Sequence, residues 1–160
     1  MTRIKPILII GYGNPLRSDD GIGWYVAERL AQQWGDQVDV ITAHQLTPEH
    51  AEALAEASLA FFIDAVDKAL SPELAQCVPV ALDEASSSGF THQCAPQTIL
   101  LYAKLLYDHS PQAFLVSVSG ENFDHGDTLT PHALAAAEAA MEKATRLIRL
   151  TIKTQSPAAP

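Results

Sequence analysis

The segment Ile7–Gly23, ILIIGYGNPLRSDDGIG, carries the first structural unit of this 160-residue chain. The apolar run Ile7–Gly11 predicts a buried β-strand. After a glycine-rich loop, three apolar residues recur at helical spacing, namely Ile22, Val26 and Leu30. Ser18 or Asp19 is placed to cap that helix, and Gly35 is placed to end it. A strand, a loop and an amphipathic helix in this order begin an α/β unit.

Further β-rich runs alternate with helical patterns along the rest of the chain. Strands are predicted at Val38–Thr42, Leu59–Ile63, Val78–Leu82 and Phe114–Val118. Helices are predicted at Glu49–Ala57 after an N-cap at Thr47, at Pro96–Tyr107, and after a cap at Thr130 and Pro131. We therefore expect an α/β fold, a single three-layer domain over residues 1–153, with helices on both faces of a twisted sheet. That sheet should be mostly parallel, with about five strands. The tail at residues 154–160 is expected to be disordered.

Composition excludes several classes of protein. Hydrophobic residues make up 48% of the chain and charged residues 18%, as in a globular domain. A net charge of -9 would repel nucleic acid and anionic lipid, so neither is an expected partner. The apolar run Ile7–Ile10 is too short for a signal peptide or a spanning helix, and a cytoplasmic location is expected. Cys77 and Cys94 form no disulfide or zinc pattern, so both should be reduced thiols.

The loop Gly11–Gly23 has more than one possible role. It is compatible with a tight turn followed by acidic capping. A dinucleotide fingerprint is disfavoured, because Leu16 stands where the third glycine belongs and no acidic residue ends the second strand at Thr42–His44. The carboxylates of Asp19 and Asp20 could instead bind a cation. Consecutive helical residues point about 100° apart, so at most one should face inward while the other serves the helix end.

Two later residues carry the remaining chemical signal. Asp64 follows a buried apolar strand, so it should lie at the carboxyl edge of the sheet, where ligands bind in open α/β sheets. A role as a simple turn or cap residue stays open. His92, in the loop THQCAP, could offer an imidazole to nickel or zinc, although a loop histidine is commonly just solvated. His44 sits at a strand end and could line the cleft, and Cys94 could serve as a soft nickel ligand or a thiol nucleophile.

Other catalytic patterns are absent from the sequence. There is no GxSxG nucleophile elbow, no HExxH zinc motif and no phosphate-binding GxxxxGK[ST] loop. Serine hydrolases, zincins and P-loop enzymes are therefore disfavoured.

The segment GYGNPLRSDDGIG, with Asp64 in FFIDAV and His92 in FTHQ, resembles the hydrogenase maturation endopeptidases over nearly the whole chain. The resemblance implies that Asp20, Asp64 and His92 are metal-contacting residues, with Asp20 and Asp64 also candidates for catalysis. Asp19 is left to the helix end, so Asp19→Asn is expected to be nearly silent in activity. The segments HQLTPE and SGENFDHGDTLTP look like the branch that serves bidirectional, NAD(P)-linked hydrogenases.

The resemblance also implies a reaction. Such a protease removes a short C-terminal extension from the precursor of a nickel-iron hydrogenase large subunit once nickel is in place. The nickel(II) is expected to arrive with the substrate, and the protease is expected to be monomeric. Either a carboxylate activates water, or the metal polarises the scissile carbonyl. A nonproteolytic nickel chaperone or sensor is the leading alternative, and a small nucleotide-binding module is a third.

Overall fold

The computed structural model describes residues 6–82 and 94–155. Within them the chain forms one five-stranded sheet in the order β2-β1-β3-β5-β4. The strands are β1 Ile7–Tyr12, β2 Val38–Ala43, β3 Leu59–Asp67, β4 Ala75–Pro79 and β5 Gln112–Gly120. Every pairing is parallel except that of β4 with β5. The predicted α/β class with a mostly parallel sheet is confirmed.

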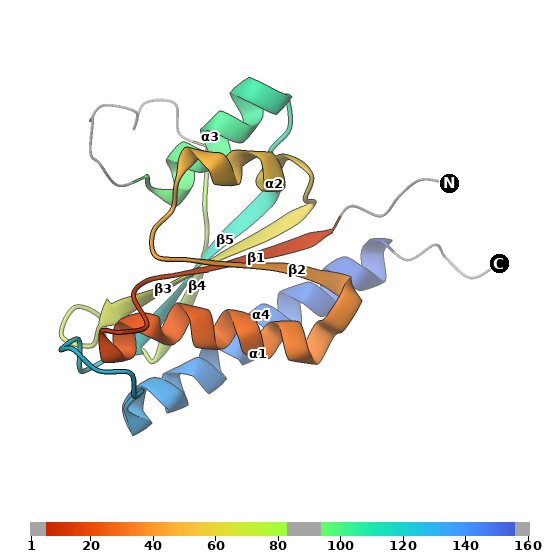
Figure 1. Ribbon diagram of the computed structural model, residues 1–160. Coiled ribbons are helices and arrows are strands. Elements are labelled where there is room, and N and C mark those ends of the chain that lie inside the picture. Colours follow the sequence, from red (N-terminus) through yellow and green to blue (C-terminus); the bar gives the residue numbers. More distant parts are fainter. Residues whose placement is uncertain (1–5, 83–93, 156–160) are drawn as a thin grey trace.

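Helices cover both faces of this sheet, as Figure 1 shows. On one face lie α1 Ile22–Trp34 and α4 Pro131–Gln155; on the other lie the turn η3 Pro48–His50, α2 Ala51–Ala55 and α3 Pro96–Tyr107. Successive strand residues point to opposite faces. Ile7 and Ile9 therefore join the core under α1 and α4, while Leu8 and Ile10 join the core under α2 and α3. Burial on both faces explains the uninterrupted apolar runs.

Two glycines allow α1 to lie against the sheet. A Cβ atom on Gly11 would stand 2.2 Å from the carbonyl oxygen of Gly23, and one on Gly23 would stand 2.5 Å from that of Ile63. Both distances are far shorter than van der Waals contact, and the obstructing atoms belong to the backbone. Any larger residue would push the start of α1 away from β1 and β3.

The helix starts and stops are partly as predicted. Gly35 ends α1 with a positive φ of 55°, and Thr130 caps α4 by accepting a hydrogen bond from Ala133 N at 3.1 Å. The predicted capping of α1 by Ser18 or Asp19 is wrong. These residues belong to a 3-10 turn, η1 Ser18–Gly21, and α1 follows from Gly21 without any side-chain cap.

The strand boundaries also differ from the sequence prediction, by one residue in β1 and β2 and by more in the other three strands. β4 lies at Ala75–Pro79 rather than Val78–Leu82; as an antiparallel edge strand it is only half-buried, which weakens its apolar signal. β3 continues past Asp64 to Asp67, because β5 still pairs with it there, and β5 extends to Gly120. The final helix runs to Gln155, two residues past the predicted boundary of the domain. In the part of the chain that the structure describes, no helix is long and apolar enough to cross a membrane.

Candidate active site

The sheet order creates a crevice at the carboxyl ends of β1 and β3. The connection that leaves β1 leads to β2 on one side, while β3 pairs with β1 on the other side. The connection from β1 to β2 contains α1, and the connection from β2 to β3 contains α2. These two helices lie on opposite faces of the sheet (Figure 1). Such a switch point is where open α/β sheets bind ligands.

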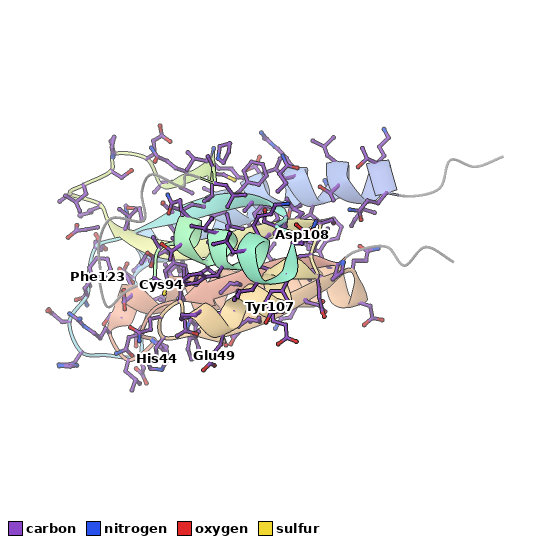
Figure 2. The ribbon with its side chains drawn as sticks, turned by 90° about the horizontal axis from the view of Figure 1, so that it is seen from above. His44, Glu49, Cys94, Tyr107, Asp108 and Phe123 are labelled. Carbon is purple, nitrogen blue, oxygen red and sulfur yellow. The ribbon has the colours of Figure 1, made fainter. Side chains whose placement is uncertain are left out.

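A cavity of about 270 Å³ occupies this position. Its lining residues are Tyr12, Gly13, Asp20, His44, Gln45, Leu46, Asp64 and Cys94. The structure thus brings together the predicted carboxylates Asp20 and Asp64, and it adds His44 and Cys94 beside them. Figure 2 shows His44 and Cys94 toward the same end of the molecule, opposite the end where α3 finishes at Tyr107. His92 lies outside the described residues, so its predicted place in the site stays a prediction.

The first carboxylate, Asp20, is held by the backbone of the loop that precedes it. Asn14 N donates a hydrogen bond to Asp20 Oδ2 at 2.8 Å. Gly13 has a φ of 139°, and a Cβ atom there would stand 2.1 Å from the carbonyl oxygen of Asp20. Only glycine allows so close an approach at such a backbone angle. The GYGN sequence therefore serves to wrap the chain tightly around Asp20.

The second carboxylate, Asp64, is half-buried on β3, one residue past the last pairing of β3 with β1. Its pKa is raised to about 6, chiefly by burial and also by the charge of Asp20, while hydrogen bonds from Ala65 N and the Tyr12 hydroxyl oppose the rise. Burial and the Asp64 carboxylate in turn raise the pKa of Tyr12, so its hydroxyl stays a proton donor. Two carboxylates that repel each other across one cavity form an environment that a cation would stabilise.

Tyr12 is a site residue that sequence reasoning missed. It is the last residue of β1, lines the cavity and donates a hydrogen bond to Asp64. Its place within GYGN, directly before the loop that carries Asp20, was the available signal. The partner of its hydroxyl could not be read from the sequence, because Asp64 is far away in the chain.

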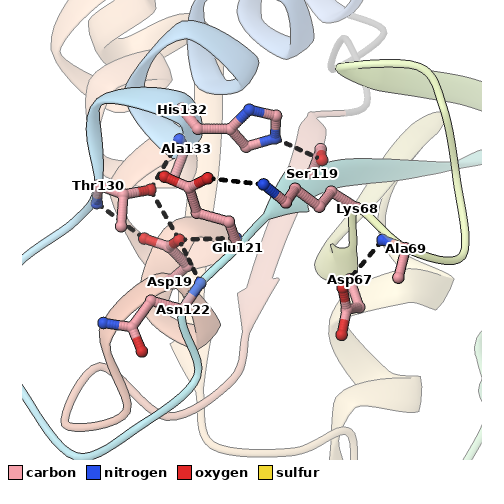
Figure 3. Close-up of polar contacts among 10 residues, drawn as sticks. All are labelled: Asp19, Asp67, Lys68, Ala69, Ser119, Glu121, Asn122, Thr130, His132 and Ala133. Carbon is pink, nitrogen blue, oxygen red and sulfur yellow. Dashed lines mark hydrogen bonds and ion pairs between the residues drawn. The ribbon is translucent and has the colours of Figure 1, made fainter.

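Asp19 has a different role from the one predicted. Its side chain is fully buried, with 0% exposure. Oδ2 accepts hydrogen bonds from Glu121 N, Asn122 N and Thr130 Oγ1 at 2.9, 3.1 and 2.8 Å, and Oδ1 accepts one from Thr130 N at 2.9 Å (Figure 3). Burial would raise the pKa of Asp19, but these four hydrogen bonds outweigh it and lower the pKa. Asp19 therefore anchors the loop between β5 and α4. Asp19→Asn is expected to lower the stability of the fold.

The described residues bring few metal-ligating side chains together in the cavity. Within residues 6–82 and 94–155, no group of three or more His, Cys, Asp or Glu side chains is arranged to hold a metal ion. His44 packs edge-on against Trp24, with ring centroids 5.6 Å apart. Trp24 Nε1 in turn donates to the carbonyl oxygen of Ala43 at 2.9 Å, which fixes the indole beside the end of β2.

Comparison with known proteins identifies the family. The chain is 31% identical over 154 residues to the hydrogenase expression/formation protein HoxM of Cupriavidus necator, a match that spans 89% of this chain and 74% of that protein. The chain belongs to the hydrogenase maturation endopeptidases. No protein-family model matches it.

Solved structures of the family share the fold. The hydrogenase maturating endopeptidase HybD of Escherichia coli aligns with a TM-score of 0.70 at 23% identity, covering 91% of this chain and 93% of that one. The maturation protease HybD of Thermococcus kodakarensis aligns with a TM-score of 0.67 at 20% identity, covering 89% and 99%. Because the chain belongs to this family, it is a peptidase of hydrogenase maturation, as the resemblance in its sequence predicted.

Proposed function

We propose that this endopeptidase reads the nickel of its substrate with Asp20, Asp64 and His92 while it removes the C-terminal extension of a hydrogenase large-subunit precursor. Members of the family act on such precursors. The observation that supports the metal-reading role is the meeting of Asp20 and Asp64 in one cavity at the carboxyl edge of the sheet. Carboxylate and imidazole donors suit a divalent nickel ion, and three of them leave positions for ligands that the precursor supplies. The nickel(II) then belongs to the substrate and is not stored by the protease.

Asp64 is the better candidate for the base that activates water. A general base works best when its pKa lies near the working pH, and burial brings the pKa of Asp64 to about 6. Asp20, whose Oδ2 already accepts a hydrogen bond from Asn14 N, is better suited to hold the ion. Nickel carried by the precursor could also polarise the scissile carbonyl, which lowers the demand on the base.

The partners follow from charge and family. We propose a monomer that works in the cytoplasm on the precursor alone, without nucleic acid or membrane, since a net charge of -9 opposes both. Service to a bidirectional, NAD(P)-linked hydrogenase stays a prediction from the segments HQLTPE and SGENFDHGDTLTP.

One experiment tests the proposal. Purified protease is mixed with nickel-loaded precursor and with apo precursor, and the mass of the large subunit is followed by mass spectrometry. We expect cleavage of the loaded form only, unaffected when the protease is treated with chelator beforehand and the chelator is then removed. Equal cleavage of apo precursor, or loss of activity after chelator treatment of the protease alone, would show that the metal role is wrong. Nickel binding without any cleavage would instead indicate a chaperone.

A further inference from the structure

Three loops at the carboxyl edge of the sheet are joined into one ordered surface. The loop before α1 is paired with the loop after β5: Ser18 N donates to Gly126 O at 2.8 Å, and Gly126 N donates to Leu16 O at 2.9 Å. The turn after β3 is joined to the end of β5, from which the same loop leaves, because Lys68 N donates to Gly120 O at 2.9 Å. Asp19 holds both ends of the loop after β5, because it accepts hydrogen bonds from Glu121 N at the start of the loop and from Thr130 N at its end. Figure 1 shows all three loops at the end of the sheet where β1, β3 and β5 finish.

Leu16 projects from this surface. Its side chain is 65% exposed, although its backbone is held on both sides. Leu16 N donates to Asn14 Oδ1 at 2.9 Å, and Arg17 N donates to Asn14 O at 3.0 Å. Ser18, two residues after Leu16, has a φ of 53°, which a residue with a side chain rarely adopts. An exposed leucine on so constrained a turn loses little conformational freedom when it is covered.

Leu70 is displayed in the same way in the turn that follows β3. Its side chain is 82% exposed. Leu70 N donates to Asp67 O at 2.8 Å, and Ala69 N donates to Asp67 Oδ1 at 2.9 Å, so an Asx-type turn holds its backbone. The second of these bonds is drawn in Figure 3. Two large apolar side chains thus stand on ordered turns at the edge that contains the cavity.

The charges around these leucines are mostly acidic. Lys68 and Glu121 form an ion pair at 3.0 Å and offset each other. Among the described residues of these loops, the remaining exposed charges are four carboxylates against one guanidinium: Asp67, Glu73, Asp124 and Asp127 against Arg17. A second copy of this chain, itself at a net charge of -9, would meet like charge there. An apolar surface with basic residues around it is the complementary partner.

We propose that Leu16 and Leu70 are the apolar contacts on which the folded large-subunit precursor docks, through an apolar patch bordered by basic residues. This inference rests on the proposed function. A precursor whose C-terminal segment enters the cavity must cover the edge around it, and Leu16 lies between Asn14 and Asp20 beside that cavity. Apolar side chains that are rigidly displayed and become fully covered dominate binding energy at interfaces.

The test measures binding separately from cleavage. Leu16→Ser and Leu70→Ser are titrated with fluorescently labelled, nickel-loaded precursor, and Kd is determined. Leu105→Ser serves as the matched control, since Leu105 is 68% exposed but lies on α3, away from the cavity edge. Thermal melting of each variant checks the fold. We expect each edge variant to raise Kd about tenfold, the control to leave Kd unchanged, and Leu16→Met to restore most of the affinity.

The possible failures are distinct. Wild-type Kd in both edge variants would overturn the proposal, as would an equal loss in Leu105→Ser. If the wild-type protein does not bind the nickel-loaded precursor, the proposal is overturned as well. A wild-type protein that binds but does not cut nickel-loaded precursor would contradict the proposed function, while the Kd series would still decide the docking surface.

Discussion

Replacing Asp19 by Asn should destabilise the protein, although the change keeps the size of the side chain. Three donors converge on Oδ2 of Asp19 and one on Oδ1. An asparagine would place its single oxygen toward the three donors, so its amide group would face Thr130 N, a second donor. Losing one hydrogen bond to a charged group costs about 1.5–3 kcal/mol, and the others weaken because their acceptor is now neutral.

The expected loss is therefore about 2–4 kcal/mol of the free energy of unfolding, a large share of a typical total. For a chain of this size each kcal/mol shifts Tm by roughly 2–4 °C. Urea titration and calorimetry would measure both quantities. Asp20→Asn is the matched control: its one bond from Asn14 N survives in an amide, so stability should hold while processing of the precursor collapses.

The pH dependence provides a second check. The hydrogen bonds to Asp19 lower its pKa below the usual 3.8, so the folded state binds the proton less tightly than the unfolded state. Its contribution to stability is present above that value and is lost as the pH falls through the folded pKa. Asp19→Asn should flatten this acid limb. An Asp19→Asn protein within about 0.5 kcal/mol of wild type, a change usual for uninvolved surface positions, would refute the anchoring role.

Three further predictions concern the cavity. Asp64→Asn should abolish processing yet stabilise the fold above pH 6, by at most about 3 kcal/mol. The pKa of Asp64 is raised in the folded state, so the contribution of Asp64 to stability falls as the pH rises from 3.8 to about 6. A urea midpoint at neutral pH no higher than that of wild type would contradict this prediction. Tyr12→Phe should lower kcat several-fold with little change in KM, since Asp64 loses its hydroxyl donor; steady-state kinetics on loaded precursor decides, and an unchanged kcat would exclude the role. His92→Ala should fold normally by circular dichroism but fail to shift the precursor on gels, and normal processing would remove His92 from the site.

Local pattern in the chain was sufficient for most of the architecture. Apolar runs specified β1 and the buried part of β3, the Leu and Ala content specified α3 to the residue, and Thr130 was correctly read as a cap. These signals are local because strand burial and capping depend on neighbouring residues. β4 escaped because an edge strand buries one side only and carries a weak apolar pattern.

Only the folded chain shows which groups the two adjacent carboxylates, Asp19 and Asp20, contact. The sequence was sufficient to place Asp20 near Asp64. Asp20 follows the first strand and Asp64 follows the buried part of the third, and these two strands end at the same edge of the sheet. It assigned Asp19 to the helix end, but it could not identify the partners of Asp19, which lie 102 to 111 residues away, nor pair Tyr12 with Asp64. Hydrogen bonds between distant segments depend on how the elements pack in three dimensions, so they cannot be predicted from the spacing of residues along the chain.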